Sequence, residues 1–552
     1  MSFSKGQFSF LFILTVLLFP FVFSSCKFRQ KVNLIIHNAT IYTVDKDFSV
    51  QQAMAVKDGK IVAVGNNEDI LKNYESDSIE DMSGKFVYPG FIDAHCHFTG
   101  YATDLWKCDL TGTTSFDDVL HHLADFTKSY DKEWVYGRGW DQNDWPVKEF
   151  PSKERLDALY PDKPVFLKRI DGHAALVNQK ALDIAGILPG ATITGGEIEV
   201  KNGKLTGILV DNAMDLVESK IPLIEDAYAK QLYLQAQQTC FSYGLTGVHD
   251  CGVSEHTIDL VDASQKEGKL KMKIFALLTD SAPYYERWIK RGIYKTERLH
   301  VGGFKVYADG ALGSRGACLL QPYSDKPGWN GFLLSDPLHF RQVAEKLGNT
   351  KFQLCTHAIG DSANRVILDI YGDVLYARND RRWRIEHAQV IDEKDIPMFG
   401  KYSIIPSVQP THATSDMYWA GGRLGSARIK EAYAYKQLMK QNDWIPLGTD
   451  FPVEDINPFK TFLAAFARVD DKGYPAGGFQ MENALTRGEA LKGMTIWAAL
   501  AAFEEKEKGS LENGKAADFI ILDTDLMKCT VSTILTSKVL QTYINGEKVF
   551  GK

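Results

Sequence analysis

The chain has 552 residues, of which 45% are hydrophobic and 24% charged, a composition typical of a globular protein with an ample core. The formal net charge is −7 and no basic cluster occurs, so nothing in the sequence supports nucleic-acid binding. The 8 cysteines stand at irregular spacings, which does not indicate a disulfide framework.

The first 26 residues are predicted to be a leader rather than part of the fold. Lys5 gives a positive start, an apolar run covers residues 8–23, and small residues precede Cys26. This pattern favours a lipoprotein-type signal peptide with Cys26 lipidated, and therefore an exported bacterial lipoprotein that is periplasmic or anchored in the outer membrane. Phe23 is unusual three residues before such a cysteine, which leaves ordinary signal cleavage open. A retained anchor is a third interpretation, although the run contains Pro20 and is short for a membrane span.

Two β-rich segments at opposite ends of the chain are predicted to form one small sandwich. Residues 32–88 contain hairpin strands joined at Asp58-Gly59, and residues 505–549 repeat this pattern with strands at 518–523 and 540–550. The intervening residues 89–504 are then left for a single larger domain.

That larger domain is predicted to be an α/β structure, a (β/α)8 barrel. Eight apolar segments of strand length occur in it: Phe91–His95, Thr246–Asp250, Met272–Leu278, Gly302–Tyr307, Phe352–His357, Arg384–His387, Ser403–Val408 and Trp444–Thr449. Eight is the number that such a barrel needs. Residues 98–243 become a large insertion after the first strand, and a further strand-like run at 164–170 is assigned to it.

The first barrel strand ends in His95-Cys96-His97. Because side chains alternate along a strand, His95 and His97 point the same way and Cys96 points into the opposite layer. Two imidazoles directed at one point form half of a metal site. The pattern is weak by itself in a chain with 13 histidines, so its meaning depends on what the other strands supply.

The other strands supply further candidate ligands at their carboxyl ends, where barrel active sites lie: Lys305, His357, His387 and Asp450. A metal hydrolase needs this set, since imidazoles hold the cation, an anion bridges two cations and a carboxylate moves protons. Each residue alone has a plainer interpretation, as a hydrogen-bonded core histidine or, for Asp450, a helix cap. His249 and Asp250, at the end of the second strand, are predicted to hydrogen-bond around the ligands.

Lys305 is the unusual member of the set, because an ammonium has no lone pair and repels a dication. It either stays outside the coordination sphere as a cation or reacts with CO2 to become a carbamate. The carbamate is anionic and has two oxygens that bridge two metals. Crowding by metal and loss of water disfavour the ammonium form, which leaves the amine nucleophilic.

The order His-x-His, Lys, His, His, Asp along a barrel resembles the amidohydrolase superfamily, of the amidohydrolase 3 type, and within it the branch of N-substituted formamide deformylases. Four more runs resemble that branch: Phe304–Gly310, Arg169–His173, Gly244–Asp250 and Gly139–Trp145. The resemblance covers nearly everything from Val32 to Val549 and also implies the sandwich built from both chain ends.

The resemblance implies that His95, His97 and Asp450 hold one metal, that His357 and His387 hold another, and that the Lys305 carbamate bridges them. Two zinc ions per chain are therefore expected, or one if Lys305 is not carboxylated, with manganese, iron and cobalt as alternatives. Metal-bound hydroxide then attacks an amide-like carbonyl, and Asp450 acts as general base and then general acid.

Two other functions stay open. The first is deamination of a cyclic amidine-like substrate at a single metal, but sites of that type place a glutamate soon after the fifth-strand histidine, and here Asp361 follows His357. The second is a non-catalytic lipoprotein that binds a ligand or a metal on an inherited barrel. Turnover that depends on the metal separates enzyme from binding protein.

The substrate is expected to be a small molecule with an amide-like bond, and membrane contact only through lipid at Cys26. Formamides, N-acyl amines, N-acyl amino acids, dipeptides and cyclic amides all fit the metal chemistry, and the oligomeric state leaves no mark in the sequence. Within the insertion, His173 is a candidate catalytic contact to the substrate carbonyl, or else it caps a turn. Candidate substrate contacts are Arg169, Arg315, Trp140 and Asp141; packing for Trp140 and an ordinary connection for Arg315 are the competing interpretations.

Overall fold

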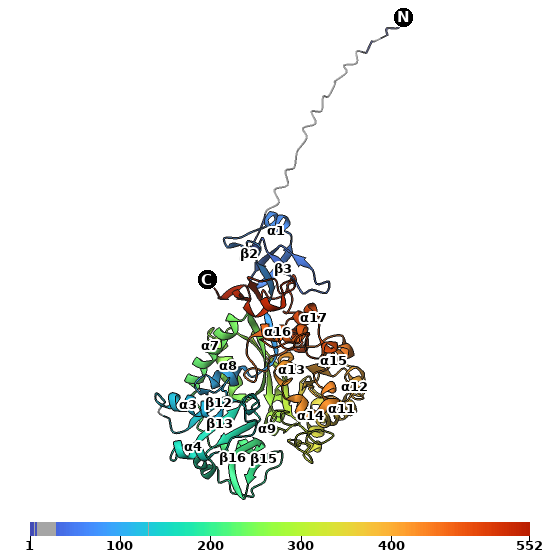
Figure 1. Ribbon diagram of the computed structural model, residues 1–552. Coiled ribbons are helices and arrows are strands. Elements are labelled where there is room, and N and C mark those ends of the chain that lie inside the picture. The colour runs from blue at the N-terminus through green and yellow to red at the C-terminus, as the bar shows by residue number, and fades with distance from the viewer. Residues whose placement is uncertain (5, 8–28, 131, 552) are drawn as a thin grey trace.

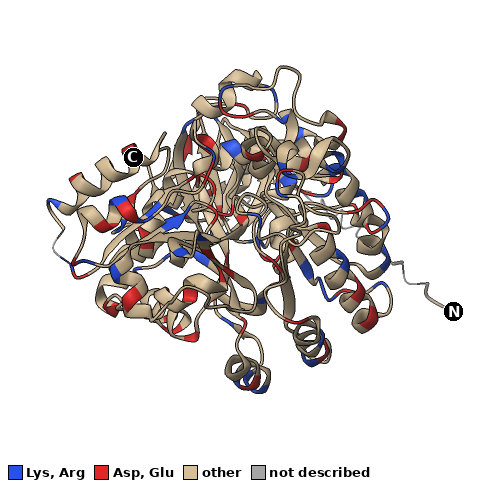
Figure 2. Ribbon diagram, turned by 60° about the horizontal axis from the view of Figure 1, so that its bottom comes forward, with Lys and Arg blue, Asp and Glu red and all other residues tan. Residues whose placement is uncertain are grey.

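The computed structural model of the chain describes residues 1–4, 6–7, 29–130 and 132–551 (Figure 1). Most of the expected leader, including Cys26, lies outside these described residues. None of the described helices is long and apolar enough to span a membrane. Lys and Arg are interspersed with Asp and Glu over the molecule (Figure 2).

A barrel of parallel strands forms the centre of the molecule. Its neighbouring strands are, in order, β10 (Phe91–Cys96), β17 (Leu245–Val253), β18 (Lys273–Thr279), β20 (Leu299–Tyr307), β21 (Gln353–Ala358), β22 (Arg384–His387) and β23 (Ile405–Ser407). Each pairs in parallel with the next, as the sequence predicts. These strands are almost entirely buried, because helices cover a sheet of this kind on its outer face.

The eighth strand was predicted at 444–449, but this segment is not a regular strand in the structure. It forms one parallel bridge, between Val408 and Leu447. Pro446 has no N–H to donate, which limits a regular ladder here. The ring nevertheless closes, since Gly448 N–H donates to Val408 O at 3.1 Å and Ala94 N–H donates to Leu447 O at 3.1 Å. Only glycine fits at 448, because a Cβ there would lie 2.5 Å from His95 N.

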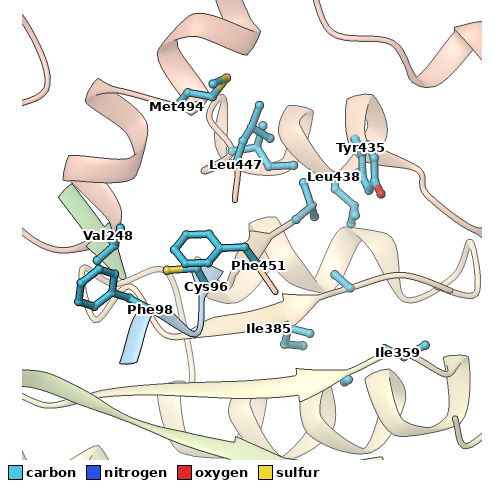
Figure 3. Packing of buried hydrophobic residues seen from close by; sticks show 14 of the residues in the cluster. Cys96, Phe98, Val248, Ile359, Ile385, Tyr435, Leu438, Leu447, Phe451 and Met494 are labelled. Atoms are coloured by element: carbon cyan, nitrogen blue, oxygen red, sulfur yellow. The ribbon is translucent and has the colours of Figure 1, made fainter. Parts of the chain in front are cut away.

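Helices cover the outside of the barrel and bury apolar faces against it. They include α7 (Asp226–Ser242), α8 (Glu255–Lys266), α9 (Ala282–Arg291), α10 (Pro337–Gly348), α11 (Asp361–Leu375), α12 (Ile396–Tyr402), α15 (Tyr435–Asn442), α16 (Pro458–Ala467) and α17 (Arg487–Gly493). In α11, the buried Ala363, Ile367 and Tyr371 recur at helical spacing. Figure 3 shows Cys96 in the main apolar cluster with Phe98 and Val248, so Cys96 faces away from the predicted ligands.

The chain between β10 and β17 folds into its own mixed sheet. Its strand order is β11 (Cys108–Asp109), β12 (Val135–Trp140), β13 (Val165–Arg169), β14 (Ala174–Val177), β16 (Lys204–Asp211) and β15 (Gly196–Lys201). The strand expected at 164–170 is β13. Figure 1 shows this sheet at the lower left, with α3 (Phe116–Thr127) and α4 (Glu154–Leu159).

Two further sheets lie at the chain ends, and the second of them joins strands from both ends, as predicted. One has the order β6 (Lys60–Gly65), β5 (Ala53–Lys57), β2 (Leu34–His37) and β8 (Ile79–Asp81). The other has the order β26 (Glu547–Phe550), β25 (Val539–Ile544), β24 (Phe519–Leu522), β9 (Phe86–Pro89), β3 (Thr40–Tyr42) and β4 (Val50–Gln51). Antiparallel pairing of β24 with β9 joins the ends, and the blue and red strands lie side by side at the top of Figure 1.

Candidate metal centre

The six predicted ligands converge at the carboxyl-terminal mouth of the barrel. His95 lies in β10, Lys305 in β20 and His357 in β21, while His387 ends β22. His97 precedes helix α2 (Phe98–Asp104), and Asp450 follows the irregular eighth segment. All of them except His95, which is fully buried, line a cavity of about 540 Å³.

Asp450 lies at the centre of this cluster. Its Oδ1 atom is 3.4 Å from His95 Nε2 and 3.3 Å from His97 Nε2. His95, His387 and Asp450 each present one ligand atom, and the three atoms lie within 4.8 Å of one another. The His357 ring lies 4.6 Å from the His387 ring, measured between centroids.

Three of the histidines are oriented by an oxygen bound at Nδ1. His95 Nδ1 lies 2.5 Å from Glu386 Oε2, His97 Nδ1 lies 2.9 Å from Cys251 O, and His387 Nδ1 lies 2.8 Å from Gln409 Oε1. An Nδ1–H that donates to such an oxygen leaves the lone pair on Nε2, which is the arrangement that a metal ligand needs. His357 differs, because its Nε2 lies 3.5 Å from Gly310 O.

These residues fit a divalent cation. Asp450 Oδ1 is buried and accepts no hydrogen bond from any residue that the structure describes. The pKa of Asp450 is lowered, because His95, His412 and His97 outweigh the effect of burial. Burial in turn lowers the pKa of His95 to about 4 and holds that of His387 well below its ordinary value, so both rings are neutral at neutral pH. Neutral imidazoles and an ionised carboxylate match the donor set of zinc.

Lys305 is fully buried inside this cluster. Its Nζ lies 3.3 Å from His95 Nε2 and 4.8 Å from the centroid of the Tyr307 ring. No carboxylate among the described residues pairs with it. Burial lowers the pKa of Lys305, but interactions with Tyr307 and Cys251 outweigh that effect and raise it. A bound dication would act in the opposite direction.

One buried carboxylate that contacts a predicted ligand was not predicted from the sequence. Glu386 is fully buried, contacts His95, and also pairs with Arg384 Nε at 3.1 Å. Burial opposes ionisation, but Arg384 and His95 outweigh it and keep the pKa of Glu386 well below its ordinary range. Arg384 and Glu386 stand two residues apart on β22, so strand alternation gives them one face, and this was the available signal.

The predicted residues at the end of the second strand lie outside the ligand cluster. His249 Nδ1 is 3.1 Å from Arg384 Nη1, and Asp250 accepts hydrogen bonds from Thr99 N at 3.1 Å and Thr99 Oγ1 at 2.8 Å. His249 thus contacts Arg384, the ion-pair partner of Glu386. Asp250 hydrogen-bonds the start of α2, beside His97.

His173 reaches the barrel mouth from the insertion. Its ring lies 5.0 Å from that of His357 and lines the cavity, and its Nδ1 is 2.5 Å from Asp211 Oδ1. Burial lowers the pKa of His173, but the interaction with Asp211 outweighs the effect of burial, so the pKa is raised. Asp211 has an unusual backbone conformation, with φ 51° and ψ −126°. Asp211 was not predicted, because β14 and β16, which bring the pair together, are not apparent in the sequence.

The four predicted substrate contacts separate into two groups. Arg169 and Asp141 line the cavity, where the buried Arg169 guanidinium pairs with Asp141 and Asp171. Trp140 does not line it; its Nε1–H donates to Leu167 O at 2.8 Å inside the core of the insertion. Arg315 also lies outside and pairs with Asp325 at 2.9 Å. Trp140 thus packs in the insertion and Arg315 lies in a loop ion pair, and neither lines the cavity with Arg169 and Asp141.

A further histidine lines the cavity and was not predicted from the sequence. His412 lies in α13 (Pro410–Asp416), directly after β23, with Nε2 at 3.4 Å from Asp450 Oδ2 and Nδ1 at 3.0 Å from Glu454 Oε1. Burial lowers the pKa of His412, but hydrogen bonding to Asp450 and Glu454 outweighs it and raises it to about 10. Its place after the seventh strand was the signal. Nearby, burial raises the pKa of Asp416 to about 7.

The fold and this ligand cluster define a metal-dependent hydrolase built on a (β/α)8 barrel. The model of the amidohydrolase family matches residues 78–550. The chain is 31% identical to the putative amidohydrolase YtcJ of Bacillus subtilis, over 94% of this chain and 99% of that protein. It is 28% identical to an N-substituted formamide deformylase of Arthrobacter pascens, over 94% of this chain and 98% of that protein.

A solved structure agrees with these comparisons. An uncharacterized metal-dependent hydrolase of Pyrococcus horikoshii has a TM-score of 0.74 and 28% identity, covering 90% of this chain and 99% of that chain. The chain therefore belongs to the amidohydrolase family, and its resemblance to N-substituted formamide deformylases is confirmed.

Proposed function

We propose that this protein hydrolyses a C–N bond in a small, non-peptide amide or formamide-like substrate. The observation that carries the proposal is the convergence of ligand atoms from His95, His387 and Asp450 within 4.8 Å at the barrel mouth. Membership of the amidohydrolase family supports the reaction class. The adjoining cavity of about 540 Å³ has the size of a small-molecule site.

His95, His97 and Asp450 would hold one divalent cation, and His357 and His387 would hold a second. Zinc fits this donor set best, with manganese, iron and cobalt as alternatives. When bound, such a cation supplies Lewis-acid activation of the amide carbonyl and of water.

Lys305 would join the two positions as a carbamate. The ammonium first loses a proton to solvent, and the neutral amine nitrogen then forms a bond to the carbon of CO2 and loses a second proton. The side chain thereby changes from a cation into an anion that carries two carbamate oxygens. Complete burial, the contact with His95 and the lack of a carboxylate partner among the described residues support this assignment. With an unmodified Lys305, a single cation would be held.

Asp450 would carry the proton during the reaction. Its Oδ1 takes a proton from the attacking water while the hydroxyl oxygen bonds to the carbonyl carbon. The same oxygen then returns the proton to the nitrogen as the C–N bond breaks, which yields an acid and an amine. His173, held through Nδ1 by Asp211, would donate a hydrogen bond to the substrate carbonyl oxygen, and Asp141 and Arg169 would form the wall beside the substrate.

Deamination is the alternative chemistry, and the contacts of Asp361 disfavour it. Asp361 accepts hydrogen bonds from Leu320 N at 2.8 Å and from Ser362 N at 3.0 Å, and it does not line the cavity. The acidic residue after the fifth strand is thus engaged in loop structure. This favours hydrolysis of an amide-like bond.

We propose from the sequence alone that the mature protein is exported and carries lipid at Cys26, with no other attachment to the membrane. Membrane fractions of a bacterial host expressing the full chain test this. The wild type should sediment with membranes, and Cys26→Ala should be released into the soluble fraction.

The proposed reaction is tested with a panel of N-substituted formamides and N-acyl amines. The protein is first stripped of metal with a chelator, then assayed with and without added zinc. Turnover that vanishes on stripping and returns with zinc supports the proposal. Metal and substrate binding without turnover would favour the non-catalytic alternative, and release of ammonia from amidine-like compounds would favour deamination.

A further inference from the structure

His412 differs in its contacts from the histidines predicted to be ligands. His95, His97 and His387 each bind protein through Nδ1 and leave Nε2 directed at the cluster. Both nitrogens of His412 instead face carboxylate oxygens, at 3.0 Å from Glu454 and 3.4 Å from Asp450. Because both ring nitrogens are directed at carboxylate oxygens, His412 presents no free nitrogen to a cation, which distinguishes it from the predicted ligands.

The two oxygens of Asp450 consequently have different surroundings. Oδ1 faces His95 and His97, whereas Oδ2 faces His412. The backbone of Asp450 is fixed separately, since its N–H donates to His95 O at 2.7 Å. That bond places the main chain but does not set the rotation of the carboxylate. On the side of Oδ2, the side-chain contact is with His412.

Glu454 holds the His412 ring in place. The loop after the eighth segment turns back through a hydrogen bond from Val453 N to Asp450 O at 2.8 Å, which brings Glu454 to the far side of the ring. Glu454 Oε1 also accepts a hydrogen bond from Ser415 Oγ at 2.6 Å. One loop therefore supplies both carboxylates, and the ring is clamped between them.

We propose that His412 is a positioning residue that engages Asp450 Oδ2, so that Oδ1 alone is presented to the cation and the attacking water. The proposal rests on the proposed function, because it assigns a role within the same site. Without His412 the carboxylate turns and both of its oxygens reach the cluster. Asp450 is then kept as a ligand but loses the orientation that it needs as a base.

The test uses three variants of the full-length protein loaded with zinc. His412→Leu removes both donors, His412→Asn keeps a donor near the place of Nδ1, and His412→Gln keeps one near the place of Nε2. We expect His412→Leu and His412→Asn to lower kcat about 10- to 100-fold with little change in KM, the effect of losing a hydrogen bond to a charged group. His412→Gln should recover most of kcat. His339→Leu is the matched control, because His339 pairs with Asp280 at 2.6 Å and does not line the cavity.

A second readout does not depend on turnover. Cobalt-loaded protein reports its coordination through visible absorption, and the bound metal per chain is counted in parallel. We expect the spectrum to change in His412→Leu and His412→Asn, to be retained in His412→Gln, and the metal content to stay that of the wild type. A His412→Leu variant with wild-type kcat and spectrum would overturn the positioning role alone. A wild type that binds no cation would overturn the proposed function, and this inference with it.

Discussion

Two buried lysines on neighbouring barrel strands show how the two ends of the barrel differ. Lys273, at the start of β18, places Nζ 2.7 Å and 2.9 Å from the oxygens of Asp518 and 2.7 Å from Asn545 Oδ1. Lys305, near the end of β20, has no carboxylate partner among the described residues and lies 3.3 Å from His95 Nε2. A buried ammonium is costly unless it is paired. The ion pair with Asp518 therefore accounts for the burial of Lys273. The burial of Lys305 has no such partner to account for it, which is consistent with a role in the proposed site.

The same contrast holds for the regions around these lysines. At the amino ends of the strands, Asp518 pairs with Lys273 and accepts from Asn545 N, which fastens the carboxyl-terminal sheet to the barrel. At the carboxyl ends, ligand atoms of His95, His387 and Asp450 face one another, and Asp450 Oδ1 accepts no hydrogen bond from the described residues. Barrel enzymes separate stability from catalysis in this way.

Removing the proton carrier should have the largest effect on activity. Asp450→Asn keeps the shape of the side chain but cannot take a proton from water, so we expect kcat to fall about 1,000-fold. Steady-state kinetics on an N-substituted formamide measure this. Asp518→Asn, at the opposite end of the barrel, is the comparison, and its folded molecules should turn over normally. Equal losses in the two variants would contradict the division of roles.

Breaking the paired lysine should have the largest effect on stability. Lys273→Met leaves Asp518 buried without its cation, so we expect the free energy of unfolding to fall by about 3 kcal/mol. Chemical denaturation of metal-free protein measures this change. Lys305→Met removes a lysine that pairs with no carboxylate among the described residues, so no buried anion is left without a partner. The free energy of unfolding of this variant should change by less than about 1 kcal/mol. A larger loss in Lys305→Met than in Lys273→Met would mean that Lys273 is not the lysine that stabilises the fold.

Removing the charge that supports His95 should weaken metal binding. Glu386→Gln retains an oxygen but loses the charge that fixes the Nδ1–H of His95, so zinc affinity should fall about 10- to 100-fold. Competition with a chromophoric chelator measures the dissociation constant. Glu255→Gln removes a similar charge from a surface pair with Arg287 and should leave the affinity unchanged. An unchanged affinity in Glu386→Gln would mean that a neutral amide orients His95 as well as the carboxylate does.

A pH-dependent effect on stability is expected from Asp416, a carboxyl group in the cavity wall. Burial raises its pKa to about 7, above that of an unfolded aspartate, so the native state holds a proton that the unfolded state has lost over the interval from about pH 4 to about pH 7. Stability from this group is therefore present at low pH and is lost as the pH rises through 7. Asp416→Asn should remove that part of the pH dependence, which denaturation of metal-free protein at several pH values measures. A pH profile identical to that of the wild type would contradict the assignment.

The sequence predicts the parts of the site that depend on one strand at a time. Alternation along β10 places His95 and His97 together, and the end of each barrel strand locates Lys305 and His387. The eighth strand was predicted as regular, but Pro446 prevents a full ladder there. The barrel and the sheets made by both chain ends follow from the same periodic patterns.

The supporting residues could not be predicted, because their contacts join distant parts of the chain. His95 and Glu386 stand 291 positions apart, and His412 and Glu454 stand 42 apart. Trp140 and Asp141 show the same limit at close range. They are adjacent in sequence, yet Trp140 lies in the core of the insertion and Asp141 in the cavity wall, which only the register of β12 decides.

Metal content per chain is the decisive measurement for the proposed metal centre. The chain from Lys27 onward is purified without chelator, and its metals are counted by elemental analysis beside Lys305→Ala and Lys273→Ala. We expect close to two divalent cations in the wild type, a clear loss in Lys305→Ala and no loss per folded molecule in Lys273→Ala. One cation that is unaffected by Lys305→Ala would remove Lys305 from the metal site and favour deaminase-like chemistry. No cation in the wild type would mean that the six predicted ligands do not form a metal site.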